Sequence, residues 1–193
     1  MALDAVASDV KACQKCALWK TRRSAVPGEG SPNAEVMFVG EAPGYWEDIK
    51  GRPFVGAAGK LLDSLLAEAC LSRDRIFIGN VLKCRPPGNR DPLPSELNAC
   101  TPYLDRQIQA IKPKIIVTLG NHSTAYLFSK AGLQFNSITQ VRGKFYKSKL
   151  LNLEVTIFPT LHPAAGLYSA RYKQVLIEDF KRLKEHLTRE GLI

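Results

Sequence analysis

The fold class of this chain is decided by an apolar run and the turn that follows it, Glu35-Val-Met-Phe-Val39 and Gly40-Glu-Ala-Pro-Gly44. The run has no polar alternation, which is typical of a parallel strand covered on both faces. Three further short runs share this character: Arg75-Ile-Phe-Ile78, Lys114-Ile-Ile-Val-Thr-Leu119 and Glu154-Val-Thr-Ile-Phe158. We therefore expect a central sheet of four mostly parallel strands.

Helical periodicity alternates with these four runs. One helical face carries Leu61, Leu62, Leu65, Leu66 and Ala69, and a second carries Leu97, Leu104, Ile108 and Ile111 after Ser95, an N-cap candidate. A short helix is expected from Asn121 through Phe128, and a last one carries Leu176, Phe180, Leu183 and Leu187. Alternating strands and helices predict an α/β fold, a three-layer α/β/α sandwich, with residues 1–193 as a single domain.

Polar residues stand where the predicted strands end. Ligands of open α/β sheets bind beyond the carboxyl ends of the strands. The segments there are Gly40-Glu-Ala-Pro-Gly44, Gly79-Asn80, Gly120-Asn121 and Pro159-Thr-Leu-His162. The need for the chain to turn explains the glycines, but it does not explain Asn80 or His162. Both are therefore candidate site residues.

The composition is that of a basic globular protein. Hydrophobic residues make up 45% and charged residues 23% of 193 positions, which argues against disorder. No apolar run reaches the roughly 18 residues of a membrane span, and the start lacks the pattern of a secretory signal, so we expect a cytoplasmic location. Lys and Arg number 27 against 18 Asp and Glu, a net charge of +9 that favours a polyanionic partner such as nucleic acid.

Four of the five cysteines look like metal ligands. Cys13 and Cys16 form a C-x2-C pair, while Cys84 and Cys100 are too far apart for a second zinc knuckle. Thiolates suit zinc or an iron–sulfur cluster, and the spacing alone leaves both open. Cys70 closes an apolar helical face and is expected to be a buried core thiol.

The motifs in this order resemble those of the family 4 uracil-DNA glycosylases, the iron–sulfur enzymes of thermophilic archaea and bacteria. The resemblance runs from about Cys13 to Phe180. It rests on the four cysteines and on Gly40-Glu-Ala-Pro-Gly44 with Glu47-Asp48, Gly51-Arg-Pro-Phe-Val-Gly56, Asn80-Val-Leu-Lys-Cys-Arg-Pro-Pro87, Asn89-Arg90 and His162-Pro163. It implies a 4Fe-4S cluster on Cys13, Cys16, Cys84 and Cys100, which would tie down the N-terminal segment (about residues 1–31).

The resemblance also implies an activity: extrusion of uracil from DNA and hydrolysis of its N-glycosidic bond, which leaves an abasic site for base excision repair. His162 would donate to uracil O2 as negative charge develops there. The amide of Asn80 matches uracil O4 and N3–H, and Phe54 would stack on the flipped base. Gly40, Glu41 and Ala42 would line the uracil pocket.

Two acidic positions keep open roles. Glu41 either lines the pocket or, as a catalytic residue, also orients the attacking water. Glu47 matches the acid that lies near uracil C5 in the family, where bulk would exclude the thymine methyl group. The neighbouring Tyr45 and Trp46 depart from the family pattern, so the residue that excludes thymine is left open among these three.

Contacts with the rest of the DNA are expected from residues near the motifs. Asn89 and Arg90 lie in a proline-rich loop, and Arg85 sits beside Cys84. Three roles are left open for these residues: contact with phosphate, support of the site, or a solvated position in the loop. Leu167 is the candidate for an apolar wedge into the base stack. Arg171 and Lys173 would then meet phosphates and make the affinity sensitive to salt.

Other functions compete with the hydrolase. A non-catalytic iron–sulfur module that binds damaged DNA would keep the cysteines and the charge but would not need Asn80 and His162. Chemistry on free uridine is a weaker option. The loop Cys84–Arg90 contains no histidine of the kind that captures DNA covalently in a related branch, so we expect turnover. We expect a monomer that acts on single- or double-stranded uracil-containing DNA, with no membrane and no evident sliding-clamp peptide.

Overall fold

The computed structural model describes residues 2–193 and is built around a six-stranded sheet of order β1-β3-β2-β4-β6-β5. The strands are β1 (Glu29–Gly30), β2 (Val36–Gly40), β3 (Phe77–Asn80), β4 (Ile115–Leu119), β5 (Tyr146–Leu150) and β6 (Leu153–Thr160). The four central strands are mutually parallel and correspond to the four predicted runs. The predicted α/β class is confirmed, but the strand number of four is wrong.

The two missed strands lie antiparallel at the edges of the sheet. β1 has only two residues, too few for any periodicity. β5 is largely exposed and carries Lys147 and Lys149, so it lacks the apolar character of a central strand. Charged and very short edge strands are common because they discourage pairing with other chains.

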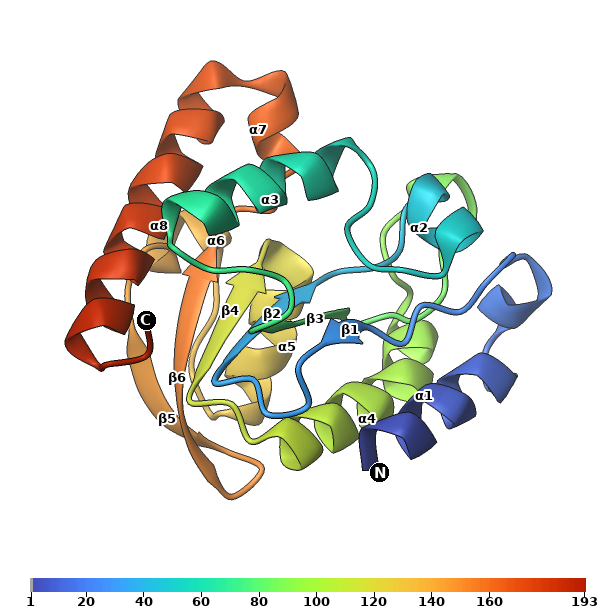
Figure 1. The fold of residues 1–193 in the computed structure, drawn as a ribbon. Coiled ribbons are helices and arrows are strands. Elements are labelled where there is room, and N and C mark those ends of the chain that lie inside the picture. Colours follow the sequence, from blue (N-terminus) through green and yellow to red (C-terminus); the bar gives the residue numbers. More distant parts are fainter. Residues whose placement is uncertain (1) are drawn as a thin grey trace.

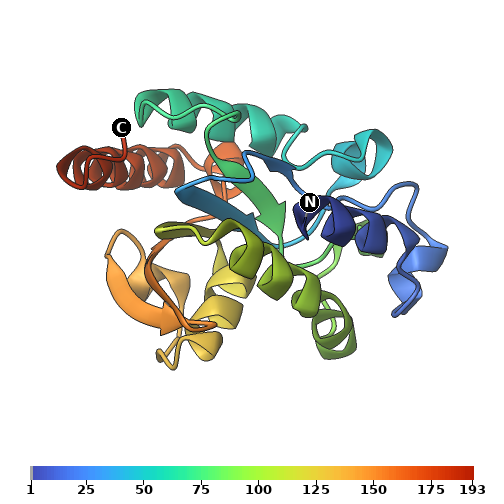
Figure 2. The ribbon, with the colours of Figure 1, turned by 60° about the horizontal axis from the view of Figure 1, so that its bottom comes forward.

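Helices cover both faces of the sheet (Figure 1). They are α1 (Ala2–Ala12), η1 (Ala17–Lys20), α2 (Tyr45–Lys50), α3 (Ala57–Glu68), η2 (Pro87–Asn89), α4 (Pro94–Ile111), α5 (Asn121–Lys130), α6 (Ile138–Val141), α7 (Ala165–Tyr168) and α8 (Ala170–Arg189). Figure 2 shows α3 and α8 on one side of the sheet and α4 and α5 on the other, the expected three layers. Among the described residues, no helix combines the length and the apolar character needed to cross a membrane.

The apolar strands are explained by these two helical layers. Along β2, Phe38 packs into the core under α3 and α8, whereas Met37 and Val39 pack into the core under α4 and α5. Successive side chains of a strand point to opposite faces, so a strand covered on both faces is apolar throughout. The carboxyl ends of β2, β3, β4 and β6 therefore meet at one edge, where loops are free to carry polar groups.

Two local predictions are wrong. Cys70 is exposed with a φ of 57°, because α3 ends at Glu68 and Cys70 lies in the following turn. Ser95 is not the N-cap of α4: the helix begins at Pro94, and the Glu96 carboxylate accepts the backbone N–H of Leu93 at 2.9 Å. The segment before Pro32 contains α1, whose Val6 and Val10 pack near the cysteines.

Candidate functional site

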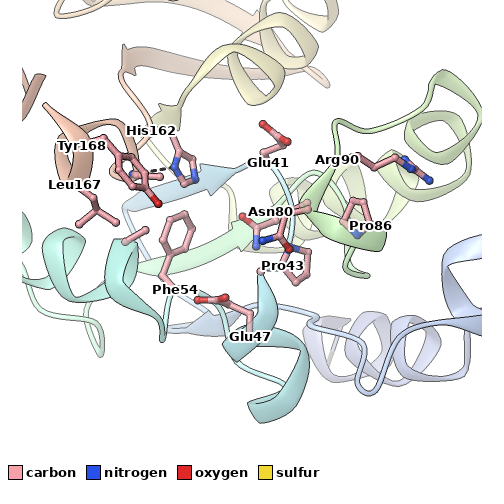
Figure 3. Close-up of a pocket in the computed structure, with 15 residues that line it drawn as sticks. Glu41, Pro43, Glu47, Phe54, Asn80, Pro86, Arg90, His162, Leu167 and Tyr168 are labelled. Atoms are coloured by element: carbon pink, nitrogen blue, oxygen red, sulfur yellow. Dashed lines mark hydrogen bonds between the residues drawn. The ribbon is translucent and has the colours of Figure 1, made fainter.

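A cavity of about 370 Å³ opens at the carboxyl ends of β2, β3 and β6 (Figure 3). Its wall combines loop residues after β2 and β6 with the last residue of β3. It is lined by Glu41, Ala42, Pro43, Gly44, Glu47, Phe54, Ala58, Asn80, Pro86, Asn89, Arg90, His162, Ala164, Leu167 and Tyr168. Residues from motifs more than a hundred positions apart thus share one cavity, at the edge of the sheet where the strand pattern predicts a site.

Asn80 is the last residue of β3, and its side chain reaches the cavity from the buried end of the strand. The residue is 2% exposed, and its Oδ1 has no hydrogen-bond partner among the described residues. Gly40 pairs with Asn80 in the neighbouring strand. A Cβ atom at Gly40 would lie 2.4 Å from Asn80 Oδ1 and 2.6 Å from Phe54 Cζ. Gly40 does not line the cavity, but its missing side chain makes room for two residues that do.

The backbone of Asn80 is fixed by the buried Lys83, which is not among the predicted site residues. Lys83 Nζ donates to the Asn80 carbonyl oxygen at 2.7 Å and to Gln107 Oε1 at 2.7 Å. Gln107 Nε2 in turn donates to the Pro27 carbonyl oxygen at 2.7 Å. Burial lowers the pKa of Lys83 to about 8. The only sequence signal is the position of this lysine inside the short apolar stretch Val81–Cys84.

His162 lies two residues after β6, and its ring is held as a neutral donor. Its Nδ1 accepts the backbone N–H of Ala164 at 3.1 Å, so the proton of the neutral ring is on Nε2. Burial lowers the pKa of His162 from 6.5 to about 4, and the nearby Glu47 carboxylate opposes this only in part. Gly120, with a φ of 96°, lets the chain at His162 pass close to the end of β4: a Cβ at Gly120 would lie 3.1 Å from His162 Cβ.

Phe54 forms the apolar wall between α2 and α3. The residue is 5% exposed, and its ring stacks on His162 with centroids 5.6 Å apart and 29° between the planes. Its φ of 51° is unusual for a side chain of this size. The Arg73 guanidinium holds this strained loop by donating to the carbonyl oxygens of Pro53 and Phe54. Strain that is held in place by the surroundings is a common feature of binding sites.

The two carboxylates of the cavity differ in their partners. Glu47 Oε1 accepts the backbone N–H groups of Val55 at 2.8 Å and Gly56 at 2.9 Å, so this carboxylate fixes the loop that carries Phe54. Glu41 makes no such bond with the described residues, and His122 Nε2 lies 3.9 Å from its Oε2. Burial raises the pKa of Glu41, and the His122 ring partly opposes that shift.

The predicted DNA-contact residues fall into two groups. Asn89 and Leu167 line the cavity, as does Tyr168, which is 89% exposed and was not predicted. Arg171 and Lys173 are exposed on α8, outside the cavity wall.

The two arginines of the proline-rich loop are engaged by protein groups. Arg85 Nε donates to Asn89 Oδ1 at 2.7 Å. Arg90 forms an ion pair with the buried Glu96 at 2.6 Å, an arrangement that supports the loop.

The four predicted ligand cysteines line a second, small cavity between α1, η1 and α4. Cys13, Cys16, Cys84 and Cys100 lie there with Leu18 and Tyr103, whereas Cys70 is not part of this group. Arg22 Nη1 donates to Cys84 Sγ at 3.0 Å, and the Lys83 backbone N–H donates to Cys100 Sγ at 3.2 Å. Burial raises the pKa of the Cys100 thiol to about 12. The sequence spacing thus identified a true spatial cluster.

Comparison with known proteins agrees with this geometry. The family model of the Uracil DNA glycosylase superfamily matches residues 27–184. A Type-4 uracil-DNA glycosylase of Sulfurisphaera tokodaii is 59% identical over 184 residues, which are 95% of this chain and 84% of that protein. Proteins of the same name from Archaeoglobus fulgidus and Thermotoga maritima are 46% and 41% identical. Those matches cover 95% and 98% of this chain and 92% and 96% of the relatives. The chain therefore belongs to the uracil-DNA glycosylase superfamily and groups with its type-4 members.

Proposed function

We propose that this protein is a DNA repair enzyme that extrudes uracil from DNA into the cavity and hydrolyses its N-glycosidic bond. One observation carries the proposal: the buried amide of Asn80 and the neutral imidazole of His162 face the same cavity, beside the aromatic ring of Phe54 (Figure 3). A base inside a duplex is inaccessible, so an enzyme acting on it must take the nucleotide out of the stack. The cavity is the place that would receive it.

Asn80 supplies the recognition of uracil in this proposal. Its amide donates to uracil O4 and accepts from N3–H, whereas cytosine presents the reverse pattern. The Oδ1 atom is buried and has no partner among residues 2–193, so a base offering a donor would satisfy it. Lys83 fixes the Asn80 backbone from which this side chain reaches the cavity. A wrong base would leave buried polar groups unpaired, which is an effective basis for discrimination.

His162 supplies the stabilisation of the leaving group. When the bond between C1′ and N1 breaks, the electron pair goes to uracil and negative charge develops at O2, while the sugar becomes an oxocarbenium-like cation. The Nε2–H of a neutral, fixed imidazole donates to this charge without prior reorganisation. Donors of this kind each contribute about 3–4 kcal/mol in oxyanion sites.

The two carboxylates take separate tasks. Glu47, fixed by two backbone N–H groups, is placed to exclude the thymine methyl group, and neither Tyr45 nor Trp46 lines the cavity. Glu41 is free of backbone bonds, so it can orient the water that adds to C1′ and can take up its proton. Leu167 and Tyr168 at the mouth would fill the space left by the extruded nucleotide, with Arg171 and Lys173 near the phosphates.

An oligonucleotide assay tests the function. The protein is incubated with a DNA strand containing one uracil, and abasic sites are then cleaved with alkali. We expect cleavage at the uracil position only, with free uracil released. Strands that stay intact while the protein still binds them would show a non-catalytic binding module instead.

The cysteine cavity fits the 4Fe-4S cluster that the family resemblance implies. Two N–H groups donate to cysteine sulfurs, an arrangement that suits thiolate ligands. When bound, the cluster would cross-link the N-terminal segment to α4 through Cys13, Cys16 and Cys100.

Metal analysis tests the cofactor separately from the activity. Protein purified without oxygen is expected to be brown and to contain iron and acid-labile sulfide. Colourless protein that holds one zinc ion and is fully active would contradict the cluster.

A further inference from the structure

Two adjacent aromatic residues are exposed just outside the cavity. Tyr45 and Trp46, the first residues of α2, are 45% and 53% exposed. Their rings contact edge to face, with centroids 5.2 Å apart and 82° between the planes. Neither lines the cavity, although Gly44 and Glu47 on either side of them do. The pair therefore lies at the cavity mouth and has no role in the proposed chemistry.

An arginine completes this surface and joins it to the cavity wall. The guanidinium of Arg85 lies over the Tyr45 ring, 5.2 Å from its centroid. The same guanidinium donates through Nε to Asn89, which lines the cavity. Trp46 is seated on the loop after Phe54, since a Cβ at Gly56 would lie 3.4 Å from its Cδ1. We call Tyr45, Trp46 and Arg85 the aromatic platform.

The chemistry of the aromatic platform identifies its ligand. Exposed rings beside an arginine bind nucleobases by stacking and cation–π contact, and they do so with little sequence preference. No carboxylate pairs with Arg85 among the described residues, and the whole chain carries a net charge of +9, so a polyanion is favoured. In a duplex the faces of the bases are already stacked on one another. Away from the ends of a duplex, only an unpaired base can offer a free face to the rings.

We propose that the aromatic platform binds an unpaired nucleobase next to the extruded uracil, so that the protein prefers single-stranded DNA. The inference rests on the proposed function for the position of uracil in the cavity. A strand that places one base in the cavity continues over its mouth, where α2 presents the two rings. Stacking there adds affinity that a duplex cannot use.

Binding of uracil-free DNA tests the platform without using excision. The probes are a single-stranded oligothymidylate and a blunt duplex of equal length, at one fixed salt concentration because phosphate contacts depend on salt. We expect Trp46→Ala and Tyr45→Ala each to weaken single-strand binding about 10-fold, the effect of losing one stacked base, and to weaken duplex binding far less. Trp46→Phe keeps a ring and is expected to retain most of the affinity.

Tryptophan fluorescence gives a second readout. Single-stranded DNA is expected to quench the wild-type emission, and Trp46→Phe should abolish most of that quenching while still binding. Far-ultraviolet circular dichroism checks that the alanine variants are folded.

Several outcomes would contradict the proposal that the aromatic platform binds an unpaired base. Unchanged single-strand affinity in folded alanine variants would do so, as would an equal loss for single strand and duplex. Quenching that persists in Trp46→Phe would place the stacked base elsewhere. Self-association that disappears in Trp46→Ala, without any effect on DNA, would show that the rings pack against a second copy. Failure of the uracil assay, with single-strand binding intact and dependent on the platform, would reject the proposed function alone.

Discussion

Two sets of buried polar atoms lie at the carboxyl end of β3: the Lys83–Gln107 pair and the side-chain amide of Asn80. They differ in whether their hydrogen-bonding atoms have partners. Lys83 and Gln107 bond each other and the carbonyl oxygens of Asn80 and Pro27. The Asn80 side chain begins at the same residue but leaves its Oδ1 without a partner among the described residues. The hydrogen bonds of Lys83 and Gln107 fix the backbone, whereas the unpartnered oxygen of Asn80 is available to a ligand.

This difference has an energetic consequence. An unpaired buried polar group costs about 1–3 kcal/mol of stability, so a core normally contains few of them. Local rules of folding are most often broken where a protein binds or reacts. The unsatisfied amide therefore separates the functional wall of the cavity from the structural network directly behind it, although both are buried and polar.

The largest effect is expected from His162→Ala. Loss of the Nε2–H donor should lower the rate of uracil excision about 10²- to 10³-fold, because the charge on the leaving base is no longer stabilised. Single-turnover excision on a uracil oligonucleotide measures it. The matched variant His162→Gln keeps a donor and should recover part of the rate. A rate within a factor of two of wild type in His162→Ala would remove the residue from the mechanism.

The free energy of unfolding separates the Lys83–Gln107 pair from the Asn80 amide most clearly. Gln107→Leu removes one of the two acceptors of the buried Lys83 ammonium and the donor to the Pro27 carbonyl oxygen. We therefore expect a loss of about 1–3 kcal/mol in the free energy of unfolding. Asn80→Leu removes an acceptor that has no partner, so its loss should be smaller, while uracil excision falls far more than in Gln107→Leu. Denaturant unfolding and excision rates of both variants measure this. Equal destabilisation by the two substitutions would contradict the distinction.

The pH dependence of stability follows from the lowered pKa of His162. The ring binds its proton less readily in the folded state, with a pKa of about 4, than in the unfolded chain, near 6.5. Its stabilising contribution is therefore complete above pH 6.5 and is lost as the pH falls toward 4. Thermal unfolding of wild type and His162→Gln should diverge above this window and converge below it. Parallel curves across the whole range would show that burial does not favour the neutral ring.

The smallest effect is expected from Arg171→Ala, on the exposed start of α8. If Arg171 meets a phosphate, its loss should weaken binding of uracil-free DNA a few-fold and lower the slope of log affinity against log salt by about 1. Titrations at several salt concentrations measure the slope. Lys114→Ala, which removes an exposed cation paired with Glu35 at the opposite ends of the strands, is the matched control. An equal slope change in both variants would show only a general effect of charge.

The parallel core of the sheet was predictable because its signal is local. The runs that predicted β2, β3, β4 and β6 are short and mostly apolar, since burial on both faces disfavours polar side chains. The edge strand β5 was missed because Lys147 and Lys149 face solvent and hide the pattern. The burial of Cys70 was predicted wrongly because the apolar periodicity of the sequence continues past Glu68, where α3 ends.

By itself, the sequence determined the class of fold, the edge of the sheet where polar residues gather, and the four cysteines that form a cluster. These depend on the type and order of residues along the chain. Only the tertiary structure decided which polar groups are satisfied. Lys83 is a buried cation bonded to Gln107, and Glu47 is fixed by two backbone N–H groups. In the part of the chain that the structure describes, Asn80 Oδ1 has no partner. The physical reason is that hydrogen bonding and burial depend on groups far apart in sequence, and no local pattern records which of them meet.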